Sequence, residues 1–153
     1  MLRVTMNNDP PNPSQLCIRN ATAGDAASVV RLIRQLGEAA DITEAYVLKY
    51  LAGSQRGVLI AQRGNSAHGL LSYSVRADLF HAGNSVLIEE LIVDKDCRGD
   101  GIGSALMHAL FERLPMLDCR EVCLAVMPDN QDAIRFYKRH GLVEEALFLE
   151  RHF

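Results

Sequence analysis

In the first half of the chain, the apolar residues of some segments are spaced as in a strand and those of other segments are spaced as in a helix. A short apolar run at Leu16–Arg19 predicts a strand. Thr22 and Asp25 resemble a capping box, and apolar residues then recur every three or four positions over 26–36, so a helix is expected from this start. Asp41 indicates a second helix start a few residues later.

Two β-rich runs then predict a hairpin, because Gly57–Gln62 and Leu70–Val75 are separated by a Gly-Asn-Ser loop and the second run extends to Phe80. Strands and helices continue to intermix after the hairpin, which indicates one mixed α/β unit with an antiparallel first half. The remaining predicted elements are a turn at His81–Asn84, a strand at Val86–Val93, a helix at about Gly101–Leu114, a strand at Glu121–Val126, a helix at Asn130–His140 and a terminal β segment from Leu142.

Length and composition fit one domain of ordinary globular character. The chain has 153 residues, of which 48% are hydrophobic and 23% charged. Residues 1–15 are polar and contain three prolines, so they are expected to form a loosely ordered lead-in to a single domain at 16–153. No apolar run approaches the roughly 20 residues that cross a bilayer, so no membrane partner is expected.

Charge and cysteine content narrow the expected partners and compartment. A net charge of −3 argues against general nucleic-acid binding. The four cysteines form no CxxC pair, which favours reduced thiols in a cytoplasmic protein. The histidines show no metal-ligand spacing, so no metal is expected, and His81 is interpreted as a turn residue or an acceptor contact.

The stretch Leu91–Gly103 carries the strongest chemical signal. A β-branched run passes through three glycines at alternate positions and enters a predicted helix, an arrangement that offers main-chain N–H groups to a phosphate. A Walker loop is excluded because Ile102 follows Gly101 where a lysine is required. A dinucleotide fingerprint fails because the glycine spacing differs and several strands come first. A tight turn without a ligand stays as the alternative.

Three segments together resemble the GNAT superfamily of acyl-CoA-dependent N-acetyltransferases. Arg98-x-x-Gly101-x-Gly103 is similar to the diphosphate-binding motif of that family, and Asn130–Leu142 is similar to its second motif, with Leu142 in place of the usual Phe. Ile18–Asp25 resembles the first strand and helix start. The resemblance implies an α/β (α+β) fold with a mixed, mostly antiparallel sheet of about six to seven strands, splayed in the middle and flanked by about four helices.

The resemblance also implies acetyl-CoA as the acyl donor and a set of residues that bind it. Main-chain groups of the central strand would pair with the pantetheine arm, and the N–H of Val93 would polarise the thioester carbonyl. The glycine turn would hold the diphosphate, and Asn130 would bond the arm. The implied cofactor-binding residues are Leu91, Ile92, Val93, Arg98, Gly99, Asp100, Gly101, Ile102, Gly103, Ser104, Asn130, Ala133, Phe136 and Tyr137.

Transfer of an acyl group to an amine requires a base and an acid. By resemblance, Tyr137 is the acid that protonates the leaving thiolate, with a purely structural aromatic residue as the alternative. Glu89 is the preferred base and Glu90 its rival, because neighbouring strand residues face opposite ways and only one would meet the acceptor unless a bulge re-aims the other. The alternative that both glutamates only bind the ligand, or are solvated, stays open.

The sequence therefore predicts an N-acetyltransferase that transfers an acetyl group to a primary amine of a small molecule. A protein N-terminus or lysine as acceptor, and a non-catalytic acyl-CoA-binding module, are the alternatives. The acids Glu38, Asp41 and Glu44 lie where the resemblance implies the acceptor site and would suit a cationic amine, although acids also cap helices. A homodimer is expected only because the family often forms one.

Overall fold

The computed structural model describes residues 14–37 and 41–153 of the chain. These residues form strands, α-helices and four short 3₁₀ segments, one of which, Ala23–Asp25, leads directly into the first helix. The elements are β1 (Cys17–Asn20), α1 (Ala26–Ile33), α2 (Glu44–Leu51), β2 (Arg56–Arg63), β3 (Ser66–Asp78), β4 (Gly83–Val93), α3 (Ile102–Phe111), β5 (Cys119–Leu124) and α4 (Gln131–Arg139).

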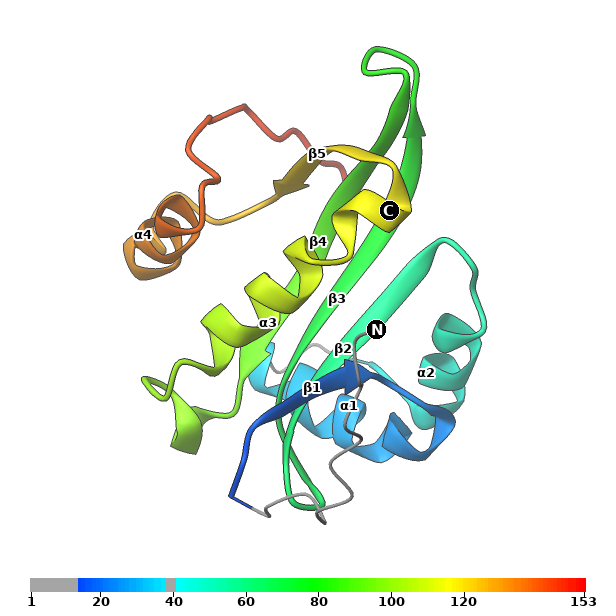
Figure 1. Cartoon of the computed structure of the whole chain (residues 1–153), viewed down its shortest axis with the longest axis vertical. Helices are drawn as coiled ribbons and strands as arrows, with labels where there is room; N and C mark the ends of the chain where they lie inside the picture. The colour runs from blue at the N-terminus through cyan, green and yellow to red at the C-terminus, as the bar shows by residue number, and fades with distance from the viewer. Residues whose placement is uncertain (1–13, 38–40) are drawn as a thin grey trace, which may run out of the picture.

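The five strands form one sheet in the order of the chain, β1-β2-β3-β4-β5 (Figure 1). The first four pair antiparallel with their neighbours, whereas β5 pairs parallel with β4. A parallel neighbour needs a crossover connection, and α3 supplies it between β4 and β5. The predicted mixed, mostly antiparallel sheet and its four α-helices are therefore confirmed.

Helices cover both faces of the sheet, and each face has its own core. On one face α1 and α2 bury Val29, Leu32 and Val47 against β2 and β3. On the other face α3 buries Leu106 and Leu110. Along each strand, successive side chains point alternately into one core and into the other, because the side chains of a strand repeat every two residues.

A bulge interrupts this alternation in the middle of β4. Ser72 of β3 pairs with Glu90, but the next residue of β3, Tyr73, pairs with Ile88, so Glu89 is an extra residue in β4. Ile88 and Ile92 are four residues apart and would share a face in a regular strand. Instead, Ile88 lies in the core under α3 and Ile92 in the core under α1 and α2. The extra residue therefore reverses the face of the sheet to which the later side chains of β4 point.

The prediction of six to seven strands was slightly too high, because residues 142–153 form neither a strand nor a helix. The predicted β segment from Leu142 was wrong. Leu147, Phe148 and Leu149 are three consecutive apolar residues, all exposed, so the segment lacks the alternation that gives a strand one buried face. Its start lies beside α4 through an ion pair between Lys138 and Glu145, 2.6 Å apart.

Several predicted element ends move by a few residues. The second helix is capped by Thr43, whose hydroxyl accepts the N–H of Tyr46 at 3.2 Å, rather than by Asp41. The long hairpin strand ends at Asp78 instead of Phe80. Residues 1–13 of the expected lead-in, and Glu38, lie outside the described residues. Within the described ranges, every helix is too short or too polar to cross a bilayer.

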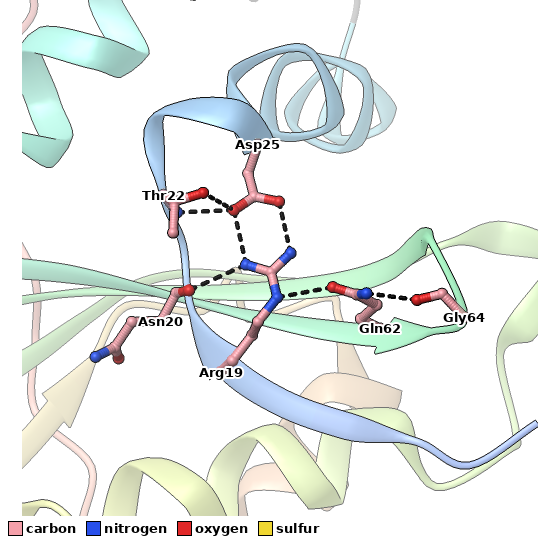
Figure 2. A network of polar contacts seen from close by, with 6 residues as sticks. All are labelled: Arg19, Asn20, Thr22, Asp25, Gln62 and Gly64. Atoms are coloured by element: carbon pink, nitrogen blue, oxygen red, sulfur yellow. Dashed lines mark hydrogen bonds and ion pairs between the residues drawn. The ribbon is translucent and has the colours of Figure 1, made fainter. Parts of the chain in front are cut away.

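A polar network ties β1 to the start of α1 and the end of β2 (Figure 2). The Arg19 guanidinium donates to both carboxylate oxygens of Asp25, at 2.7 and 2.8 Å, and to the side chain of Gln62 at 2.7 Å. Asp25 also accepts the main-chain N–H of Thr22 at 2.7 Å, which completes the predicted capping box. These bonds, the one from Arg19 foremost, lower the pKa of Asp25 to about 2. The network fixes how α1 leaves the sheet.

Replacing Asp25 by Asn should destabilise the protein by about 2 kcal/mol at pH 7, the equivalent of the lowered pKa. The folded-state pKa is below the unfolded one, so this stability is present above about pH 4 and is lost as the pH falls toward about 2. Urea denaturation should therefore show a difference in unfolding free energy between the wild type and the variant, and this difference should become smaller as the pH falls.

Asp132→Asn is the matched control, since Asp132 pairs with Arg135 on the surface of α4 and its side chain is 93% exposed. Its effect should stay below about 0.5 kcal/mol at every pH. Equal losses in the two variants would contradict the role given to Asp25.

Candidate functional site

The bulge brings two consecutive glutamates to one face of the sheet. The hydroxyl of Ser72 donates to Glu90, and the hydroxyl of Ser74 donates to Glu89 at 2.6 Å. Ser72 and Ser74 are two residues apart on β3 and share a face, the one that α1 and α2 cover. The expectation that the glutamates face opposite ways therefore fails here, because the extra residue at Glu89 re-aims the strand.

A cavity of about 140 Å³ lies between this face and the two helices. Glu90 and Ser72 form its polar end, and Tyr46 and Tyr50 contribute from α2. The rest of the wall is aliphatic: Val29, Ile33, Ile42, Val47, Val58 and Leu70. Glu89 is exposed and does not line the cavity, so the two glutamates share a face but differ in their surroundings.

Burial changes the acid–base properties of the groups around the cavity. It raises the pKa of Glu90 above its ordinary value, an effect that the hydrogen bond from Ser72 opposes and the charge of Glu89 reinforces. Burial, with the charges of Glu90 and Glu89, also raises the pKa of Tyr50 to about 12. Tyr50 therefore stays protonated at neutral pH, and Glu90 is a stronger base than a solvated glutamate.

On its other side β4 separates from β5 just after the bulge. The two strands pair from Asn84 to Ile88, opposite Cys119 to Leu124, and β5 pairs with nothing beyond that point in the described residues. Figure 1 shows β5 diverging from β4 and the chain leading on to α4. Among the described residues, no strand pairs with the main-chain edge of Leu91–Val93 that faces away from β3. An extended ligand can therefore pair with it.

The glycine turn follows directly at the end of β4. Gly99 and Gly101 have φ angles of +91° and +76°, and a Cβ added to either would meet no protein atom within 4 Å. The N–H groups from Arg98 to Ser104 make no main-chain hydrogen bond to any described residue. Ile102 is buried and anchors the start of α3. The turn thus presents free donors to open space at a helix N-terminus, which suits an anion.

Charged side chains flank the turn. Arg98 is exposed, and its Nε donates to the carbonyl of Val93 at 3.3 Å, so the guanidinium lies over the end of β4. The carboxylate of Asp100 would oppose an anion, but Arg63 from the end of β2 pairs with it at 3.2 Å. The pair leaves Arg98 to contribute positive charge to the turn.

Helix α4 supplies the remaining predicted residues. The side-chain oxygen of Asn130 caps the helix by accepting the N–H of Ala133 at 3.2 Å. A Cβ on Gly103 would approach the ring of Phe136 to 3.3 Å, so α3 and α4 meet closely where β4 ends. Tyr137 packs against the core under α3, with its ring edge-on to Phe136. Burial raises its pKa, so its hydroxyl keeps its proton.

Some features of the site had no signal in the sequence. The glutamates pair with Ser72 and Ser74 because of the register between β3 and the bulged strand β4. The position of Tyr50 beside them in the cavity depends on the same register. Asp41 and Glu44, expected near the acceptor, are exposed and do not line the cavity.

Three residues that carry metal-binding groups come together in the fold, although Glu121 is far from the other two in the sequence. Asp78, His81 and Glu121 have ligand atoms within 4.8 Å of one another. Pairing of β4 with β5 brings Glu121 to the hairpin end that carries the other two.

Known proteins resemble this chain in sequence and in fold. The model of the acetyltransferase (GNAT) family matches residues 28–142, which is more than half of the chain. A thialysine N-ε-acetyltransferase of Sus scrofa is 24% identical over 143 residues, covering 84% of each chain. An uncharacterised N-acetyltransferase of Methanocaldococcus jannaschii is 45% identical over 60 residues, which are 39% of this chain and 26% of that protein. The shared segment therefore spans about a quarter of the archaeal relative.

Solved structures share the fold at low identity. A transcriptional regulator from Bacillus halodurans C-125 superimposes with a TM-score of 0.80 at 24% identity, covering 91% of this chain and all of that one. An aminoglycoside acetyltransferase from an uncultured soil sample, in complex with sisomicin, gives a TM-score of 0.77 at 20% identity, with coverage of 90% and 95%.

Proposed function

The chain belongs to the acetyltransferase (GNAT) family, and on that premise we propose that it transfers an acetyl group from acetyl-CoA to a primary amine of a small molecule. One observation carries the proposal. The bulge in β4 puts two carboxylates beside a cavity on one face, and the same strand then separates from β5 and leads into the glycine turn. A donor-binding edge and an acceptor cavity thus share one strand.

The residues present fit acetyl-CoA. The N–H groups from Gly99 to Ser104 would hold the diphosphate, and Arg98 would add charge. The unpaired edge at Leu91–Val93 would pair with the pantetheine arm, and the amide nitrogen of Asn130 would be left to bond it. Acetyl-CoA supplies an activated acetyl group as a thioester.

The proton transfers fall to two side chains on the two faces of the sheet. The acceptor amine is almost fully protonated near pH 7, so it must lose a proton before it attacks. Glu90 takes this proton in our proposal, since it lines the cavity and burial raises its pKa, and Glu89 is the second candidate. The hydroxyl of Tyr137 gives a proton to the departing sulfur, and the N–H of Val93 stabilises the charge on the carbonyl oxygen.

A small molecule is favoured over a protein acceptor because the cavity holds only about 140 Å³. A purely acyl-CoA-binding module is disfavoured because burying Glu90 costs free energy that binding of the donor does not require.

Gly101→Val should lower the affinity for coenzyme A more than tenfold. The side chain would enter the open space above the turn, at a φ of +76° that valine disfavours. Calorimetric titration with coenzyme A measures the loss. Gly141→Val is the matched control, because Gly141 has a similar φ of +89° and open space around it but follows α4. Similar affinities in the two variants would sink the assignment of the turn.

Tyr137→Phe should reduce kcat about 100-fold and leave the affinity for coenzyme A within about twofold, because only the donated proton is lost. Release of the free thiol measures turnover, and calorimetry measures binding. Tyr73→Phe removes a hydroxyl from the same core and should change neither quantity. A small, equal effect of Tyr137→Phe on turnover and affinity would count against the acid role.

The pH dependence of kcat should report on Glu90. A base acts deprotonated, so activity should fall as the pH drops through the raised pKa of Glu90, and Glu90→Gln should lower kcat about 100-fold and abolish this acid limb. Glu89→Gln removes a charge that raises the pKa of Glu90, so the acid limb should move to lower pH with a smaller loss of rate. The reverse pattern, with the larger loss in Glu89→Gln, would assign the base to Glu89.

A further inference from the structure

We propose that the acceptor is a primary amine carried on a short apolar stem, with no second charged group. The inference rests on the proposed acetyl transfer and names the class of amine that this cavity takes. It sets the chain apart from its relatives that are named for thialysine and aminoglycosides.

The distribution of charge in the cavity is the first argument. Among the described residues that line it, Glu90 is the one charged side chain, and it lies with Ser72 at one end. One carboxylate matches one ammonium group. The described aliphatic side chains of the wall offer no partner to a second ammonium, a carboxylate or a ring of hydroxyls, and each of these groups is costly to bury without one.

The depth of burial is the second argument. Val47 and Val58, on opposite walls, are 3% and 5% exposed, and Leu70 is fully buried. These three side chains belong to the core under α1 and α2, so the inner wall is shielded from water, and the cavity reaches solvent at Tyr46, which is 56% exposed. Burial is also the largest cause of the raised pKa values of Glu90 and Tyr50.

The size of the cavity limits the stem. An apolar cavity of about 150 Å³ holds benzene, a ligand of six heavy atoms, and this cavity of about 140 Å³ is of similar size. A stem of about five carbon atoms fills it when the ammonium lies at Glu90. Tyr46 and Tyr50 are the polar-tipped side chains beside it, and Arg56 lies over the ring of Tyr50 at 4.9 Å, outside the lining residues.

Two amines of equal length test the inference directly. n-Pentylamine and 1,5-diaminopentane differ only in the far end, which is a methyl group in one and an ammonium in the other. With purified protein and acetyl-CoA, kcat/KM should be at least tenfold higher for n-pentylamine. Calorimetric titration of both amines into the protein with coenzyme A should give the same order of affinity.

A variant that adds a carboxylate to the wall should reverse the preference. Ile42 lines the cavity from the loop before α2 and is half-buried, so Ile42→Asp should raise kcat/KM for the diamine relative to n-pentylamine at least tenfold. Leu48→Asp is the control, since Leu48 is 45% exposed on α2 and does not line the cavity. It should leave the ratio unchanged. Melting temperatures show whether both variants fold.

The outcomes separate this inference from the proposed function. Transfer to 1,5-diaminopentane as fast as to n-pentylamine, or faster, would overturn the inference and leave acetyl transfer standing. If no amine is acetylated, the proposed function fails and the calorimetric comparison decides alone: tighter binding of n-pentylamine supports the apolar cavity, and equal or weaker binding rejects it.

Discussion

One extra residue in β4 is the constraint on which the rest of the site depends. Without the bulge at Glu89, Ile88 and Ile92 would face the same core, and one of the two glutamates would be buried under α3. With it, Ile88 fills the core under α3, Ile92 fills the core under α1 and α2, and both carboxylates reach serines of β3 on the latter face. The bulge thus determines both the packing of the two cores and the position of the two carboxylates.

The bulge also explains why β4 and β5 separate where they do. A bulged strand bends and twists more strongly than a regular one, and β5 stays paired with β4 only up to Ile88, the residue before the extra one. Main-chain groups left unpaired inside a sheet cost free energy unless a ligand or water satisfies them. An extended polar partner would therefore stabilise the unpaired main-chain groups in this gap. In the proposed function, that partner is the pantetheine arm of acetyl-CoA.

The sequence predicted best what depends on neighbouring residues. The glycine turn, the cap at Thr22 and Asp25 and the helix that Asn130 begins were all found, because each is decided within a few positions. It did worse where the outcome depends on distant residues. The facing of Glu89 and Glu90 requires the register between β3 and β4, and the group of Asp78, His81 and Glu121 requires the pairing of β5.

In the proposed mechanism, the basicity of Glu90 and the choice of amine have a common cause. Burial raises the pKa of the carboxyl, which would make its ionised form a better acceptor of the amine's proton. The buried side chains of Val47, Val58 and Leu70 in the same cavity would make a second charge on the acceptor costly. The hydrogen bond from Ser72 sets the limit, since it stabilises the ionised form enough to keep a buried carboxylate available. A change that lets water into the cavity should therefore lower the pKa of Glu90 and relax the choice of amine together.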